Sequence, residues 1–189
     1  MGSINFGLIL GHIQGLDLRS QGSGNAGATN ALRILGARSG IFVFVGDAFK
    51  GYFSLYLCNL VLAQQENLLL LPSDYLFLSL IFSLIGHCYP IWFNFRGGKG
   101  AATALGAFLF IDPFFVFFPM IGFLLVFLCS RFVGLSTISA FFILFLQTFF
   151  IDHGVHHNFH PFSLIIFLFI VYTHRSNIQS MFKGTEEKI

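Results

Sequence analysis

The chain has 189 residues, of which 56% are hydrophobic and only 10% are charged, and phenylalanine alone occurs 28 times. A soluble domain carries about 25% charged residues, so this composition excludes an ordinary water-soluble protein and indicates a membrane protein. The formal net charge of +2 also argues against a nucleic-acid-binding protein, which needs a strongly basic domain with a clustered basic face.

Apolar runs alternate with short polar segments along the whole chain. The first run, residues 3–15, would form a helix of roughly 20 Å, whereas the hydrocarbon core of a bilayer is about 30 Å thick. The further runs are residues 41–63, 75–93, 101–111, 114–129, 132–151 and 162–172. Several of them are shorter than the ~20 residues of a full span. We therefore expect an all-α integral membrane protein with about seven transmembrane helices, some of them short or half-spanning.

Positively charged residues occupy alternate polar segments. They are Arg19, Arg33 and Arg38, then Arg96 and Lys99, then Arg131, and finally Arg175, Lys183 and Lys188. The intervening segments QQENLLLLPSD, IDP and DHGVHHNFHP contain no lysine or arginine. The positive-inside rule then predicts an outside N-terminus, a cytoplasmic C-terminus and basic segments that all face the cytoplasm. With no linker or repeat in view, residues 1–189 are predicted to form a single polytopic domain.

The first polar segment, RSQGSGNAGATNALRILG, contains a literal G-x-G-x-x-G pattern at Gly22, Gly24 and Gly27. A dinucleotide-binding fingerprint requires a strand before the glycines and a βαβ unit around them, and this segment instead leaves a membrane run. Glycines without side-chain bulk can form an anion-binding nest, and a helix starting near Thr29 would add its positive end. Arg33 could then pair with phosphate oxygens. The segment is therefore interpreted as one wall of a phosphate site.

Two further basic segments fall on the same predicted face. GHCYPIWFNFRGGKGAAT places Arg96 and Lys99 around two glycines at the start of a membrane run, although it lacks the residues of a Walker A loop. YTHRSNIQSMFKGTEE follows the last run and contains His174, Arg175 and Asn177. Each segment alone could be a simple positively charged anchor. Together with the first segment they predict a shared cytoplasmic site for phosphates.

Other polar residues are given structural interpretations. Asp47 and Lys50 are expected to pair inside a membrane helix, with Arg33 or Asn30 as alternative partners, because an unpaired intramembrane charge is costly. His87 is interpreted as a helix-end or supporting residue. The segment HGVHHNFH contains His153, His156, His157 and His160. Their spacing could bind zinc, but no cysteine or carboxylate cluster completes the set, and no metal site is predicted. Cys58, Cys88 and Cys129 are interpreted as small buried hydrophobic residues.

The three basic segments, read with the blocks GSINFG, GLDLR, DAFKG and SRFVGLSTIS, resemble the PlsY family of bacterial acyl-phosphate:glycerol-3-phosphate acyltransferases along nearly the whole chain. The chain departs from the usual family pattern at Asn5, where proline is common, at Ala26, and at Gly134. Family members also carry several more apolar residues before the position of Gly2, so the first run here is short.

The resemblance implies an enzyme of the bacterial inner (cytoplasmic) membrane with its active site facing the cytoplasm. Such an enzyme transfers a fatty acyl group from acyl phosphate to the 1-hydroxyl of sn-glycerol 3-phosphate, giving lysophosphatidic acid and phosphate in the first acylation of phospholipid synthesis. Neither coenzyme A nor acyl carrier protein serves as donor. No cofactor, no nucleic acid and no obligatory protein partner is implied beyond the two substrates and membrane lipid.

The resemblance also assigns site residues by motif. The catalytic set is Ser23, Arg33, Lys99, His174 and Asn177. The substrate-binding set is Gly22, Gly24, Asn25, Thr29, Asn30, Arg96, Gly97, Gly98, Thr137 and Arg175.

The chemistry leaves two alternatives open. Either His174 or a phosphate oxygen of the donor accepts the hydroxyl proton, and cations near His174 would lower its basicity and favour the phosphate. Ser23 is expected to donate a hydrogen bond to phosphate, since no G-x-S-x-G elbow marks it as a nucleophile. A transporter or binding protein for an organic phosphate is the alternative function, although no inverted repeat supports it.

Overall fold

A computed structural model describes residues 1–64, 72–150 and 159–189. All regular secondary structure in these ranges is helical, which confirms the predicted all-α class. The chain forms two compact units, Met1–Ile111 and Asp112–Ile189. The expected single domain stays a prediction.

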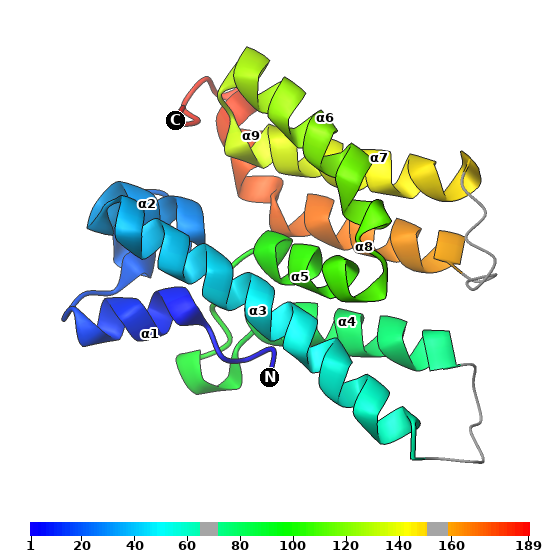
Figure 1. The fold of residues 1–189 in the computed structure, drawn as a ribbon. Helices are drawn as coiled ribbons and strands as arrows, with labels where there is room; N and C mark the ends of the chain where they lie inside the picture. Colours follow the sequence, from blue (N-terminus) through cyan, green and yellow to red (C-terminus); the bar gives the residue numbers. More distant parts are fainter. Residues whose placement is uncertain (65–71, 151–158) are drawn as a thin grey trace. The chain divides into compact units, whose positions relative to one another are not determined.

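The first unit is built around one long helix, α3 (Ala37–Leu62), drawn in cyan in Figure 1. Helices α1 (Phe6–Ile13), α2 (Ala28–Leu35), α4 (Pro72–Cys88) and α5 (Ala101–Ile111) all contact α3. Two short 3-10 helices, η1 (Leu18–Ser20) and η2 (Ile91–Phe93), lie in the connections. Asn5 caps α1, because its Oδ1 accepts a hydrogen bond from the Leu8 N–H at 3.0 Å.

Small residues let α3 and α5 approach each other closely. A Cβ atom added to Gly51 would lie 2.0 Å from the Thr103 carbonyl oxygen, and one added to Gly106 would lie 1.7 Å from the Ala48 carbonyl oxygen. Real Cβ atoms do not come this near to backbone, so only glycine fits at both positions. Close backbone approach at glycine is how membrane helices gain packing energy without a hydrophobic driving force.

The second unit is built around α7 (Val133–Phe150), which contacts α6 (Phe114–Ser130), α8 (Phe159–Thr173) and α9 (Arg175–Phe182). The rings of Phe115 and Phe159 are packed with their centroids 4.3 Å apart. The Gln147 side chain donates from Nε2 to the Phe114 carbonyl oxygen at 3.2 Å and so links α7 to the start of α6. Phenylalanine thus supplies much of the packing inside this unit as well as its apolar outer faces.

Each of the predicted apolar runs overlaps a helix, but few of these helices are long enough to cross a bilayer. Within the described residues, three candidate spans are Ala37–Leu62, Asp74–Phe93 and Val133–Phe150, and a fourth exists if α8 and α9, which bend by 54°, form one span. Helices α5 and α6 are apolar but shorter, and α1 has eight residues. Large apolar side chains on α3, such as Ile41 and Phe49, are exposed, as expected for lipid-facing residues. The count of seven crossings therefore stays a prediction.

Replacing Gly106 by valine is expected to destabilise the protein, because the new side chain would collide with the Ala48 backbone. Overpacking costs about 1–3 kcal/mol, which corresponds to a melting temperature lower by roughly 3–10 °C for a chain of this size. Thermal unfolding of the purified protein in detergent measures the effect. Leu109→Val, at an exposed position of the same helix, is the control. An unchanged melting temperature for Gly106→Val would contradict the close α3–α5 contact.

Candidate functional site

The glycine-rich segment of residues 22–33 forms a tight turn followed by α2. Gly22 and Gly24 adopt left-handed backbone conformations, with φ of 55° and 70°, which residues with side chains rarely adopt. A Cβ atom at Gly22 would also lie 2.3 Å from Asn30 Oδ1. Ser23 lies between the two glycines and is exposed. The turn therefore presents the Ser23 hydroxyl between two glycines whose backbone conformations favour glycine.

Asn30 holds this turn together. The side chain is fully buried, and both of its Nδ2 hydrogens are donated to backbone carbonyls, those of Leu18 at 2.8 Å and Gln21 at 3.0 Å. Its Oδ1 accepts from the Ser23 N–H at 3.0 Å. A buried amide that is this well satisfied fixes the surrounding backbone. The geometry thus gives Asn30 a structural role in placing Ser23.

The other predicted residues of this segment lie on α2 or just before it. Helix α2 begins at Ala28, so a helix start near Thr29 is confirmed. Thr29 and Arg33 are on the helix and Asn25 precedes it, and all three side chains are half-buried. The helix follows η1 and the glycine turn directly, without the βαβ unit that a dinucleotide site requires.

The segment of residues 96–99 folds back on the end of α4. Gly97 N–H donates to the Cys88 carbonyl at 2.9 Å, and Gly98 N–H donates to the His87 carbonyl at 3.2 Å. A Cβ atom at Gly98 would lie 2.2 Å from His87 Nε2. These glycines are therefore required by close approach to α4. Arg96 is exposed and Lys99 is half-buried at either side of them.

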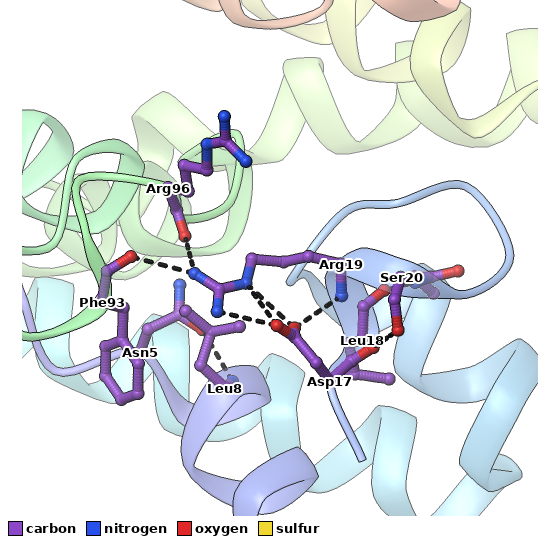
Figure 2. A network of polar contacts seen from close by, with 9 residues as sticks. Asn5, Leu8, Asp17, Leu18, Arg19, Ser20, Phe93 and Arg96 are labelled. Atoms are coloured by element: carbon purple, nitrogen blue, oxygen red, sulfur yellow. Dashed lines mark hydrogen bonds and ion pairs between the residues drawn. The ribbon is translucent and has the colours of Figure 1, made fainter.

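Arg19 joins the two glycine-rich segments, as Figure 2 shows. The guanidinium forms a bidentate ion pair with Asp17, with Nη2 2.7 Å from Oδ2 and Nε 2.9 Å from Oδ1. Its Nη1 donates to the Phe93 carbonyl at 2.9 Å and to the Arg96 carbonyl at 3.3 Å. Hydrogen bonds from Arg19 lower the pKa of Asp17, so this carboxylate stays ionised at neutral pH.

A buried charged cluster lies beneath the segment of residues 96–99. Lys50 Nζ is 2.9 Å from Asp47 Oδ1, 2.7 Å from His87 Nδ1 and 2.5 Å from the Ile4 carbonyl oxygen, and the Asp47, Lys50 and His87 side chains are almost completely buried. An ammonium has three N–H donors and no acceptor. His87 Nδ1 must therefore accept, which leaves the ring proton of a neutral His87 on Nε2, the atom that faces Gly98. The predicted Asp47–Lys50 pair is confirmed, and His87 lies in the last turn of α4, as predicted for a helix-end residue.

The remaining predicted site residues lie in the second unit. His174 is buried between α8 and α9, and its Nδ1 lies 2.8 Å from the Ile170 carbonyl. Because a carbonyl only accepts, Nδ1 carries a hydrogen, and Nε2 of the neutral ring is the acceptor. Thr137 is buried in α7 and its hydroxyl donates to the Val133 carbonyl at 2.9 Å. Arg175 is exposed, with its guanidinium 4.4 Å from the centre of the Tyr172 ring.

Asn177 contacts two residues that sequence reasoning did not select. Its Nδ2 donates to Glu186 Oε1 at 2.6 Å. A Cβ atom at Gly134, on α7, would lie 2.8 Å from Asn177 Cβ, so glycine at this departure from the family pattern makes room for α9. The carboxylate of Glu186 orients the Asn177 amide. The only signal for Glu186 in the sequence is its place within the C-terminal block FKGTEEKI.

The structure thus groups the predicted residues by unit. The predicted site residues with numbers from 22 to 99 lie on the two segments that Arg19 connects. The others lie on α7 or around α9, and they are Thr137, His174, Arg175 and Asn177. A single site shared by both groups stays a prediction. Arg19 was missed as a site residue because its partners are carbonyl groups more than 70 residues away, and a sequence pattern does not reveal such contacts.

The weaker sequence candidates have ordinary structural roles where they can be placed. His153, His156 and His157 lie outside the described residues, while His160 Nδ1 is 2.8 Å from the Thr148 hydroxyl. No cluster of metal-ligating side chains occurs among residues 1–64, 72–150 and 159–189. All three cysteines are free, and the interpretation of Cys129 as buried is wrong, because it lies on an exposed face of the apolar helix α6.

Comparison with known proteins places the whole chain in one family. A sequence model described as "Glycerol-3-phosphate acyltransferase" matches residues 1–184. Curated relatives with the same description include proteins of Fusobacterium nucleatum, at 38% identity, and Aquifex aeolicus, at 37% identity. The matches cover 100% of this chain and 92% and 93% of these relatives.

Two similar crystal structures are of PlsY (YgiH), described as an integral membrane glycerol 3-phosphate acyltransferase. Its glycerol 3-phosphate form has a TM-score of 0.86 and 36% identity, covering 100% of this chain and 90% of that one. Its lysophosphatidic acid form has a TM-score of 0.83 and 35% identity, covering 100% and 89%. The apolar helices and this full-length similarity define a multi-pass integral membrane protein. Within that class, the chain belongs to the PlsY-type glycerol-3-phosphate acyltransferase family.

Replacing Lys50 by methionine is expected to destabilise the protein strongly, because the Asp47 carboxylate would lose its buried cation. Breaking a buried pair from one side costs about 3–5 kcal/mol, which corresponds to a melting temperature lower by roughly 10 °C. Lys183→Met, at an exposed position, is the matched control. The double variant Asp47→Asn/Lys50→Met should recover part of the loss. A single variant as stable as the wild type would contradict the described ion pair.

Proposed function

We propose that this protein transfers a fatty acyl group from acyl phosphate to the 1-hydroxyl of sn-glycerol 3-phosphate. The products are lysophosphatidic acid and inorganic phosphate. The observation that carries the proposal is the full-length similarity to PlsY, whose crystal structures include a glycerol 3-phosphate form and a lysophosphatidic acid form. The two glycine-rich segments of the first unit support it, because they combine cations with backbone positions that suit phosphate groups.

In the first unit, the proposed phosphate-binding groups are Ser23, Arg33, Arg96 and Lys99. Arg33 and Lys99 are half-buried, and Ser23 and Arg96 are exposed. A guanidinium can bind phosphate through two parallel hydrogen bonds, and an ammonium acts as a point charge. Two anionic substrates repel each other, so these cations offset that repulsion. The rest of this proposed set shapes the segments: Gly22, Gly24, Asn25, Thr29, Asn30, Gly97 and Gly98.

In the second unit, His174 and Asn177 are the proposed reactive-site residues, and Thr137 and Arg175 are proposed to support substrate binding. The hydrogen bond to the Ile170 carbonyl fixes the orientation of the His174 ring. The Asn177 amide is oriented by Glu186. Both side chains are thus held in one orientation before substrate binds, which lowers the cost of reaching the reactive geometry.

The proposed reaction needs no covalent enzyme intermediate. The 1-hydroxyl oxygen of glycerol 3-phosphate attacks the acyl carbonyl carbon, the hydroxyl proton leaves, and the bond between that carbon and the phosphate oxygen then breaks. Acyl phosphate is a mixed anhydride, so its phosphate is a good leaving group. The protein therefore contributes proximity and electrostatic stabilisation, and Ser23 is proposed to donate a hydrogen bond instead of acting as a nucleophile.

The donor's own phosphate is the proposed proton acceptor. A phosphate oxygen lies next to the attacked carbonyl carbon in every acyl phosphate molecule, so it is always within reach of the hydroxyl. His174, with Nε2 as an acceptor, then orients the hydroxyl. The acyl chain stays in lipid and only the head group enters the polar site, so neither coenzyme A, acyl carrier protein nor any other cofactor is required.

The proposed setting is the bacterial inner membrane, crossed about seven times, with the N-terminus outside and the basic segments in the cytoplasm. The charge distribution supports this orientation through the positive-inside rule. The substrates are then glycerol 3-phosphate from the cytoplasm and acyl phosphate in the membrane, and the reaction is the first acylation of phospholipid synthesis.

Purified protein incubated with glycerol 3-phosphate and palmitoyl phosphate is expected to release equal amounts of lysophosphatidic acid and phosphate. Mass spectrometry and a colorimetric phosphate assay measure the two products. Palmitoyl-CoA in place of palmitoyl phosphate is expected to give none. Activity with palmitoyl-CoA alone would contradict the proposed donor, whereas binding of glycerol 3-phosphate without any product would indicate a transporter or binding protein.

The His174→Gln variant tests the proposed proton acceptor. An obligatory general base contributes about 10²–10⁴-fold to the rate, whereas loss of an orienting residue is expected to lower kcat by less than about tenfold and to raise KM for glycerol 3-phosphate. Steady-state kinetics with palmitoyl phosphate separates the two. A fall in kcat of several hundredfold, with an unchanged melting temperature, would assign the proton to His174.

A further inference from the structure

Arg19 connects two segments that lie far apart in the sequence. On one side it belongs to η1, directly before the glycine turn that carries Ser23. On the other side its Nη1 donates to the carbonyls of Phe93 and Arg96, at 2.9 and 3.3 Å, in the turn that leads to Lys99. Figure 2 shows these contacts converging on one guanidinium group. A single side chain therefore bridges the backbones of both proposed phosphate-binding segments.

One end of this bridge is coupled to Ser23 by further hydrogen bonds, and the other end lies in a strained turn. Asn30 bonds the Leu18 and Gln21 carbonyls and the Ser23 N–H, so a shift of η1 moves Ser23. At the other end, Phe93 and Arg96 flank two residues with left-handed backbone conformations, Asn94 at φ 55° and Phe95 at φ 56°. Such conformations are strained for residues other than glycine and persist only where the surroundings hold them.

The contacts require an arginine. Nε and Nη2 face Asp17 while Nη1 faces the two carbonyls, so opposite edges of one planar group are used at the same time. A lysine has a single nitrogen and cannot bind both partners in this way. Asp17 also accepts from the Arg19 backbone N–H at 2.9 Å. The pair is therefore local, and the guanidinium is oriented before it meets the distant carbonyls.

We propose that Arg19 is a positioning residue for acyl transfer, which holds the Ser23 segment and the Lys99 segment in register, and that Asp17 orients it. This inference rests on the proposed function and deepens it. Arg19 acts through backbone geometry and does not touch the substrate. Small displacements of binding groups are costly, since a shift of about 1 Å can lower a rate ~100-fold.

Chemical rescue distinguishes positioning from general stability. In the purified full-length protein, Arg19→Ala is expected to lower kcat/KM for glycerol 3-phosphate by about 100-fold. Added guanidinium, at millimolar concentrations far below denaturing ones, is expected to restore turnover several-fold, whereas methylammonium is not. Arg38→Ala is the matched control, because Arg38 is exposed at the start of α3, and it should keep wild-type kinetics with no response to guanidinium.

Two outcomes would overturn the inference: wild-type kcat/KM in Arg19→Ala, or a loss that guanidinium does not rescue. If Arg19→Ala does not fold, Arg19→Lys takes its place, and it is expected to lose at least about tenfold in kcat/KM at a nearly unchanged melting temperature. Normal kinetics in Arg19→Lys would then overturn the inference.

The proposed function can fail separately. If the wild type transfers no acyl group from acyl phosphate, the affinity for glycerol 3-phosphate, measured by calorimetry, becomes the readout. Arg19→Ala is still expected to weaken that binding about tenfold, with Arg38→Ala unchanged. Equal affinity in Arg19→Ala and the wild type would overturn the role of Arg19. Absence of any glycerol 3-phosphate binding by the wild type would overturn both proposals.

Discussion

The first unit depends on the contacts that neutralise the buried ammonium group of Lys50. A charge in the middle of an apolar helix is tolerated only when it is fully paired, and Lys50 meets this requirement with a carboxylate on α3, an imidazole on α4 and the Ile4 carbonyl before α1. Three parts of the chain must therefore converge on one point. His87, once its Nδ1 faces Lys50, presents Nε2 to Gly98. The position of the glycine-rich segment thus follows from where the buried charge is neutralised.

Close helix packing makes this buried cluster possible. Gly51 and Gly106 bring α3 and α5 together at backbone contact, and a Cβ atom at Gly86 would lie 2.9 Å from the backbone of Gly2 and Ser3. The charged side chains Asp47, Lys50 and His87 are almost completely buried in this packing. A low local dielectric strengthens the hydrogen bonds that are made and penalises any that are lost. The small residues and the charged residues of this unit therefore depend on each other.

The sequence predicted those features that depend on residues close together in the chain. Apolar runs predicted the helices, and the paired spacing of Asp47 and Lys50 predicted their contact. The glycine-rich segment predicted a helix start near Thr29, and α2 begins at Ala28. Contacts between distant residues were not predictable, because they produce no periodic pattern in the sequence. Examples are the bonds of Arg19 to Phe93 and Arg96, and the bond of Asn177 to Glu186. The number of membrane crossings was also not predictable, because several helices are shorter than a bilayer is thick. For such helices, length alone does not show whether they cross the membrane.

The distribution of precise contacts fits a reaction whose reactivity resides in the substrate. An acyl phosphate is already activated, so a protein that uses it gains most by fixing the positions of two anionic head groups. In the first unit, accordingly, several side chains with well-satisfied polar groups lie in or next to the segments that carry the proposed phosphate-binding groups. Asn30 and Arg19 bind backbone groups and His87 packs against Gly98, while Ser23 and Arg96 are exposed on the segments that these side chains fix. For such chemistry the residues that fix the backbone matter alongside those that meet the substrate.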